Sequence, residues 1–286
     1  MPTLLDYRRR IRSVKSTQQI TRAMKMVSAA KLRRAQERAL ATRPYSKILR
    51  EMLANVAAAA QQSPDASDQP LLAVRPEKRI LAIVITADRG LAGAFSSNLI
   101  KLAQRFVNEH PDADMSFELI GRKGRDYFRR RSKNITGEYI DVFRKITWES
   151  GERIADGIIE RFSKAEVDSV YLFVNEFKSM MASNLSAMRL LPIEVPSTES
   201  AADYIYEQTP AELLGSLLPR YVKMQIYKAL LESAAAEHAA RMTAMDAATS
   251  NASDVIDKLT LYMNRVRQAT ITKEIIEVVS GAAALD

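Results

Sequence analysis

The sequence has 286 residues and contains no cysteine, so disulfide bonds, thiolate nucleophiles and cysteine metal sites are excluded. Glycine and proline are scarce, at nine and ten residues, which favours long regular elements joined by few turns. No apolar run approaches the eighteen residues of a membrane-spanning helix, and the first residues lack the apolar core of a secretory signal. With 47% hydrophobic residues, we expect a soluble chain that buries a core and can still dock on a membrane complex.

Acidic residues are almost missing from the first fifty positions, which hold fourteen Lys or Arg against only Asp6 and Glu37. The formal net charge of the whole chain is +8, so the remainder is mildly acidic. A basic block of this density indicates an acidic partner, a nucleic acid or an anionic lipid surface, or else a solvated helix face.

The scarce glycines and prolines divide the chain into four parts. We expect an N-terminal helix over 1–62, a linker over 63–79, an α/β domain over 80–205 and a C-terminal helix over 206–286. Pro44 is expected to kink or interrupt the first helix. The run 220–280, free of glycine and proline, would span roughly 90 Å as one helix, too long for a compact domain of this mass.

Heptad spacing near the C-terminus predicts a coiled coil, because side chains three and four apart share one helix face. This seam comprises Met242, Met245, Thr249, Ala252, Ile256, Leu259, Met263, Val266 and Thr270. A matching stripe in the first helix comprises Ile11, Val14, Ile20, Met24 and Val27. The pairing can be parallel or antiparallel, and an inserted domain whose ends lie close together favours the antiparallel form.

Between the helices, strand-like and helix-like segments alternate, which predicts a mostly parallel, Rossmann-like sheet covered by helices. We expect strands at 80–86, 117–120, 139–142, 170–174 and 190–195, and helices at 98–109, 124–131 and 148–164. Ser96 or Ser97 is the expected cap of the first of these helices.

No arrangement of residues predicts catalysis. The loop Asp88–Phe95 follows the first strand, but it lacks the third glycine of the dinucleotide fingerprint and the Gly-Lys-Ser/Thr of a triphosphate loop. The histidines, His110 and His238, are far apart, and no carboxylate–histidine group has metal spacing. We expect Glu274 and Glu277 to face solvent or a basic partner and not to act as an acid–base pair. We therefore predict no catalytic residue, no cofactor and no metal.

Two other functional classes remain open on the residues alone. A nucleotide-binding α/β enzyme with helical extensions would show affinity for ATP or NAD. A basic coiled-coil nucleic-acid adaptor would show salt-sensitive retention on DNA or RNA. Tyr7 and Tyr45 are the only aromatic residues among the first fifty, which weakens this second alternative because base-stacking side chains are missing.

Both ends of the chain resemble the ATP synthase gamma subunits. The first motif is Ile11-Arg-Ser-Val-Lys-Ser-Thr-Gln-Gln-Ile-Thr-Arg-Ala-Met-Lys-Met-Val-Ser-Ala-Ala-Lys-Leu-Arg-Arg-Ala35. Near the other end are Ala240-Arg-Met-Thr-Ala-Met-Asp-Ala-Ala-Thr249, Asn264-Arg-Val-Arg-Gln-Ala269 and the signature Ile271-Thr-Lys-Glu-Ile-Ile-Glu-Val-Val-Ser-Gly-Ala282. Asp88-Arg-Gly-Leu-Ala-Gly93 is similar to the family's loop after the first strand.

The resemblance implies a non-catalytic rotor subunit of the H+-transporting two-sector ATPase. It implies an antiparallel coiled coil inside a ring of three alpha and three beta subunits. The α/β domain would then be a foot resting on the epsilon subunit and the c-subunit ring. Rotation of this central stalk would couple ion flow to ATP synthesis or hydrolysis by imposing different conformations on the three beta subunits. The driving ion, proton or sodium, stays open.

The resemblance also implies roles for individual residues. Met24 and Arg241 would lie close together beside a beta subunit, and Arg267 and Gln268 would meet a beta-subunit loop. Thr272, Glu274 and Glu277 would lie within the bearing. The foot segment Asp203-Tyr-Ile-Tyr-Glu207, with Tyr204, Tyr206 and Glu207, would face the c ring.

Two departures from the family pattern follow from the missing cysteines. Ala92 stands where many relatives carry cysteine, and the disulfide-bearing insert of chloroplast gamma subunits is absent, which excludes redox control by that route. Met1 without a transit peptide favours a bacterial or already processed protein. We expect a peripheral membrane protein on the cytoplasmic face of the bacterial inner membrane, bound through its partners and not to nucleic acid.

Overall fold

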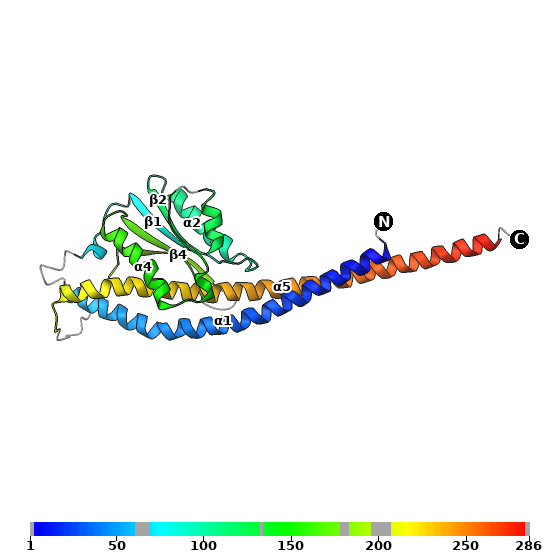
Figure 1. Cartoon of the computed structure of the whole chain (residues 1–286), viewed down its shortest axis with the longest axis horizontal. Coiled ribbons are helices and arrows are strands. Elements are labelled where there is room, and N and C mark those ends of the chain that lie inside the picture. Colours follow the sequence, from blue (N-terminus) through cyan, green and yellow to red (C-terminus); the bar gives the residue numbers. More distant parts are fainter. Residues whose placement is uncertain (1–2, 61–68, 132–133, 178–182, 196–206, 284–286) are drawn as a thin grey trace. The chain divides into compact units, whose positions relative to one another are not determined.

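The computed structural model describes residues 3–60, 69–131, 134–177, 183–195 and 207–283. Its contacts divide the chain into two compact units. Unit 1 combines Met1–Ser28 with Met242–Asp286, and unit 2 is Ala29–Arg241. The two long helices, α1 (Leu4–Ala60) and α5 (Pro210–Ala283), each contribute to both units (Figure 1). The four-part division expected from the sequence stays a proposal.

In unit 1, α1 and α5 form an antiparallel pair. The hydroxyls of Thr21 and Thr249 are 2.8 Å apart, and the Lys25 ammonium donates to the Asp246 carboxylate. A later residue of α1 thus meets an earlier residue of α5, which confirms the antiparallel coiled coil. The same register sets Leu4 opposite Val266, so α5 continues past the beginning of α1 (Figure 1).

The predicted seam of α5 is confirmed, because all nine of its residues are buried or half-buried. The predicted stripe of α1 is partly wrong. Ile11, Val14 and Met24 are half-buried, but the side chains of Ile20 and Val27 are 56% and 55% exposed. Polar residues take the seam positions instead, with Thr21 and Ser28 buried and Gln18 and Lys25 half-buried. They tolerate the seam because α5 offers polar partners there, as at Thr249 and Asp246.

In unit 2 the same two helices bury a more apolar seam. On α1 it contains Leu32, Ala35, Ala39, Leu49 and Leu53, and on α5 Leu218, Val222, Ile226, Leu230 and Ala234.

The helices also differ from expectation at their prolines. Pro44 does not interrupt α1, where it is exposed, and α5 begins at Pro210 and includes Pro219. A capping box starts α5 there: the Glu212 amide donates to Thr209 Oγ1 and the Thr209 amide to Glu212 Oε2, each at 3.3 Å.

The α/β part of unit 2 is a five-stranded sheet in the order β3-β2-β1-β4-β5. Its strands are β1 (Arg79–Ile85), β2 (Asp114–Ile120), β3 (Ile135–Tyr139), β4 (Ser169–Phe177) and β5 (Ser183–Leu191). Only the β4–β5 pair is antiparallel among these strands. The mostly parallel sheet is therefore confirmed.

The expected bounds of the third and fifth strands were wrong. The third strand ends where it was expected to begin, since Val142–Arg144 is a 3-10 helix, η3. The fifth strand runs from Ser183 to Leu191 instead of over 190–195.

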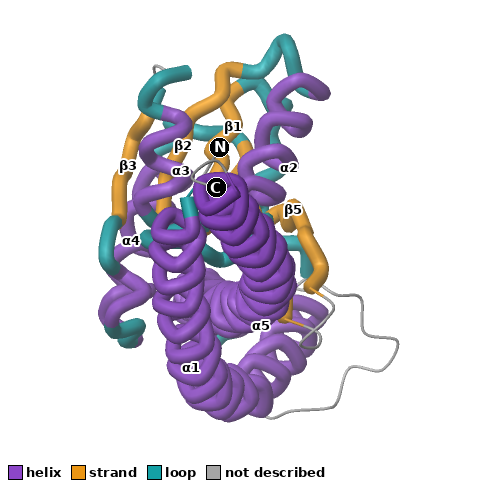
Figure 2. Tube along the Cα trace, turned by 90° about the vertical axis from the view of Figure 1, so that its right-hand side faces the viewer, coloured by secondary structure: helices purple, strands orange, loops and turns teal. Residues whose placement is uncertain are grey.

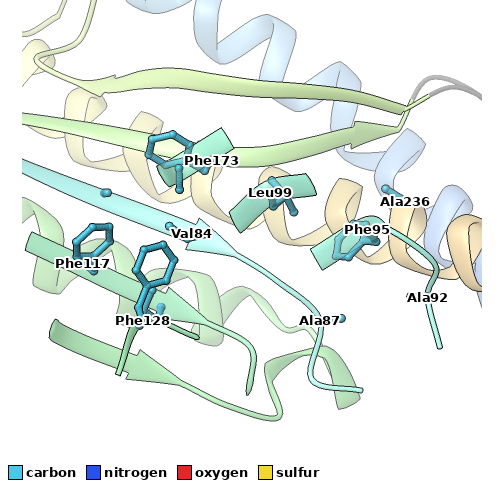
Figure 3. Close-up of a cluster of buried hydrophobic side chains, with 12 residues drawn as sticks. Val84, Ala87, Ala92, Phe95, Leu99, Phe117, Phe128, Phe173 and Ala236 are labelled. Atoms are coloured by element: carbon cyan, nitrogen blue, oxygen red, sulfur yellow. The ribbon is translucent and has the colours of Figure 1, made fainter. Parts of the chain in front are cut away.

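The sheet is covered by α2 (Phe95–Glu109), α3 (Arg122–Phe128) and α4 (Trp148–Ser163), and a 3-10 helix, η2 (Pro70–Leu72), precedes it. With right-handed crossovers, the strand order places α2 and α3 on one face of the sheet and α4 on the other. Figure 2 shows α2 and α4 on opposite sides of the strands. Aromatic and aliphatic side chains fill the space under α2 and α3 (Figure 3), with the rings of Phe117 and Phe128 stacked at 4.6 Å.

The expected serine cap of α2 was wrong. The helix begins at Phe95, so both serines lie inside its first turn. Ser96 Oγ accepts from the Ala87 amide, and Ser97 Oγ donates to the Ala94 carbonyl. Ser96 thus fastens the β1–α2 loop to the helix that follows it.

Candidate functional site

The last turns of α5 carry an exposed apolar surface. All residues from 271 to 280, here called the tip segment, are exposed. The large apolar residues are Ile271, Ile275, Ile276, Val278 and Val279, with side-chain exposures from 46% to 72%. At 3.6 residues per turn these five residues share one broad face of about 160°, and Lys273, Glu274 and Glu277 lie on the opposite side. An apolar face this broad left in water indicates that another protein covers this segment.

Most of the expected contact residues lie in or just before the tip segment. Arg267, Gln268, Thr272, Glu274 and Glu277 are all exposed. The Thr272 hydroxyl donates to the Gln268 carbonyl at 2.9 Å, and Glu277 pairs with Lys273 at 3.5 Å within the helix. Arg267 and Glu274 form no salt bridge with any residue that the structure describes. The five side chains thus lie on the surface of one helix and do not form a pocket.

Arg241 is placed differently, because its side chain is only 11% exposed. Its Nη2 donates to Glu237 Oε1 at 2.6 Å and to the Gly90 carbonyl at 3.3 Å, and lies 3.5 Å from the Arg89 carbonyl. Its Nη1 is 3.4 Å from His238 Nδ1. Arg241 lines a hollow in unit 2 together with Arg89, Glu237 and His238; the other lining residues are Lys31, Asp88, Asp141, Phe143 and Arg144.

Burial controls the charges around this hollow. It raises the pKa of Glu237 despite the opposing attraction of Arg241. Burial, together with the positive charges of Arg241 and Lys31, lowers the pKa of His238 to about 4. His238 is therefore neutral near pH 7 and is a poor candidate for a proton-transfer group there.

The remaining expected residues are not brought together with these. Met24 is half-buried in unit 1, whereas Arg241 belongs to unit 2, so their proximity stays a prediction. Glu207 is exposed just before α5, and Tyr204 and Tyr206 lie outside the described residues.

Glu237 was not among the residues predicted from the sequence. Its position four residues before Arg241 on the same helix is the sequence signal that could have identified it.

The loop after β1 does not form a phosphate cradle. Asp88 Oδ1 already accepts from the backbone amides of Arg122 and Asp141, at 3.2 and 3.1 Å. The amide at the beginning of α3 is thus occupied by a carboxylate of the chain itself. Within the described ranges, no group of three His, Asp or Glu side chains could hold a metal, and no helix could cross a membrane.

Comparisons with known proteins agree with this picture. A family model described as ATP synthase matches residues 3–285. An ATP synthase gamma chain from Solibacter usitatus is 62% identical over 286 residues, which cover all of both chains. This chain belongs to the ATP synthase gamma chain family. A gamma chain from Pelotomaculum thermopropionicum is 52% identical, also over the whole length of both.

Solved structures share the fold. A chain of the Euglena gracilis mitochondrial ATP synthase matches with a TM-score of 0.68 at 17% identity, covering 99% of this chain and 94% of that one. A chain of the Tetrahymena thermophila central stalk and c ring matches with a TM-score of 0.60 at 22% identity, covering 80% and 99%. The fold is thus shared although most residues differ.

Proposed function

We propose that this chain is the central stalk of an ATP synthase and turns inside a ring of three alpha and three beta subunits. The exposed apolar tip segment of α5 is the observation that carries the proposal. An enclosing ring would bury side chains that the chain by itself leaves in water, and each large aliphatic group gains about 1.5–3 kcal/mol when fully buried. The structural relatives described as central stalk, F1 and c-ring assemblies support the same setting.

The stalk would couple ion flow to ATP chemistry without an active site of its own. Its faces differ, so each surrounding beta subunit would meet different side chains at each angle. Turning then shifts the conformational equilibrium of each subunit by differential contact. Exposed Lys and Arg of α1 would attract acidic surfaces at long range, while each solvated pair contributes little, so no single contact would hold the stalk in place.

The foot of the stalk would be the α/β domain, resting on the epsilon subunit and the c ring. Glu207, together with the neighbouring foot segment, is our proposed contact on the c-ring side. The chain would then be held at the cytoplasmic face of a bacterial inner membrane only through its partners. The chain would be a required rotor subunit that is not catalytic alone.

The test replaces the two proposed contacts nearest the tip segment. Arg267→Ala with Gln268→Ala should leave thermal unfolding of the chain unchanged, because both side chains are exposed. It should lower either assembly with alpha and beta subunits or the ratio of ion pumping to ATP hydrolysis. Lys101→Ala with Arg105→Ala, exposed on α2, is the matched control. Normal coupled synthesis and ATP-driven rotation in the Arg267/Gln268 variant would refute these roles.

A further inference from the structure

The loop Asp88–Gly93, here called the joint loop, contains a backbone conformation that needs outside support. Leu91 has a φ of +64°, in the left-handed region that residues with a side chain rarely occupy. Its side chain is nevertheless 62% exposed, so burial of that side chain does not hold the conformation. Such strain persists where the surroundings fix the backbone.

The α/β domain holds the first side of the joint loop. Asp88 Oδ1 accepts from the amides of Arg122 and Asp141, and the side chains of these two residues form a salt bridge at 2.6 Å. The loop is therefore fastened to the beginning of α3 and to the turn before η3.

The shaft helix α5 holds the second side. Arg241 reaches across to the carbonyls of Arg89 and Gly90, and the buried Glu237 carboxylate holds its guanidinium in place. The side chains of Arg241 and Glu237 are 11% and 6% exposed, so water screens this pair little.

We propose that Arg241 is a positioning residue that fastens the joint loop to α5, so that the α/β domain and this part of the helix turn together. This differs from a direct contact with a beta subunit, because the guanidinium is already engaged inside the chain. An arginine suits the task, since its planar group offers several donors in a fixed fork, whereas lysine offers a single charged centre. Only the claim that the α/β domain and this part of α5 turn together rests on the proposed function.

Trypsin cleavage after Arg89 reports whether the joint loop stays closed, because cleavage of a folded loop requires local opening. We expect Arg241→Gln in the full chain to be cut at this bond at least tenfold faster than the unchanged chain. Arg241→Lys keeps the charge beside Glu237 and guards against loss of folding; it should be cut at an intermediate rate. Equal rates in all three chains would overturn the proposal.

Lys223→Gln is the matched control. Lys223 also ties α5 to the α/β domain, through Glu152 and Asp156 at 2.7 and 2.9 Å, but it does not touch the joint loop. We expect it to lower the melting temperature without faster cleavage after Arg89. If it accelerates that cleavage as much as Arg241→Gln does, general loosening explains the result and the specific role of Arg241 is refuted.

The second readout is the ratio of ion pumping to ATP hydrolysis in assembled ATP synthase. Arg241→Gln should lower this ratio, with partial rescue in Arg241→Lys. Faster cleavage with an unchanged ratio would overturn the role in turning. Failure of even the unchanged chain to assemble with alpha and beta subunits would instead contradict the proposed function, and the cleavage test would still decide the role of Arg241.

Discussion

Glu118, in the middle of β2, offers a sharp test of the electrostatics of the α/β domain. Its side chain is 1% exposed, and Oε2 has no hydrogen-bond partner among the described residues. Arg161 is the nearby cation, with its Nε 4.0 Å from Oε1. Burial raises the pKa of Glu118 from 4.5 to about 7, although Arg161 acts in the opposite direction. The ionised carboxylate is therefore disfavoured in the folded chain.

The size and sign of the effect follow from this pKa. The rise is about 2.5 pK units, and each unit corresponds to about 1.4 kcal/mol, so ionised Glu118 costs the folded state about 3 kcal/mol. Between pH 4.5 and 7 the folded chain binds more protons here than the unfolded chain. The contribution of Glu118 to the free energy of unfolding therefore falls as the pH rises through this window, and is constant above about pH 7.

Glu118→Gln keeps the shape and removes the charge. At pH 8 we expect its free energy of unfolding to exceed that of the unchanged chain by about 3 kcal/mol, and at pH 4.5 the two to differ by less than about 0.5 kcal/mol. Urea denaturation at both pH values measures this, and the other carboxyl groups cancel in the difference. Glu109→Gln, exposed at the end of α2, is the matched control. A difference between Glu118→Gln and the unchanged chain that is the same at both pH values would refute the reasoning.

Two further predictions concern backbone strain and the coiled coil. Gly121 has a φ of +91°, and a Cβ there would lie 2.0 Å from the Thr86 carbonyl oxygen, so Gly121→Ala should lower the free energy of unfolding by about 3 kcal/mol. Gly90→Ala, whose Cβ would meet only Lys123 at 3.8 Å, should lower it by less than about 1 kcal/mol in the same urea titration, and equal losses would contradict the steric argument. Lys25 and Asp246 are 41% and 62% exposed, so a double-mutant cycle with alanine should give a coupling below about 1 kcal/mol that vanishes in 1 M salt. A salt-independent coupling of several kcal/mol would show that solvent does not screen the pair.

The sequence predicted the coiled coil well where apolar residues dominate the seam. Every seam position of α5 from Met242 to Thr270 was found, because most of them are apolar and the spacing is regular. On α1 the same spacing is hidden, since polar residues such as Thr21 and Ser28 occupy the buried positions. Whether a polar residue can be buried depends on which residue faces it. The residue that faces Thr21 is Thr249, which is 228 positions away in the sequence. Local periodicity contains no such information.

The α/β domain was predicted as a class, but its details depend on contacts between distant segments. Strand β3 has only half-buried residues, and its sequence carries a glycine, Gly137, so the apolar run after it was mistaken for the strand. The role of Arg241 likewise could not be predicted from the sequence. The acid at position 237 can be found from its spacing to Arg241. The carbonyls of Arg89 and Gly90, which also accept from Arg241, belong to a loop about 150 positions earlier.

The register of the coiled coil links these local facts to the proposed function. With Thr21 opposite Thr249, the first residue of α1, Leu4, lies opposite Val266, and α5 continues to Ala283. About seventeen residues of α5, roughly 25 Å of helix, therefore have no residue of α1 beside them. Within that length the exposed apolar side chains leave the seam: Ile275, Ile276 and Val279 lie on the side of the helix opposite Val266 and Thr270. A longer α1 that followed the seam would not cover this face, which is why the surface favours a partner outside the chain, such as a surrounding ring of subunits.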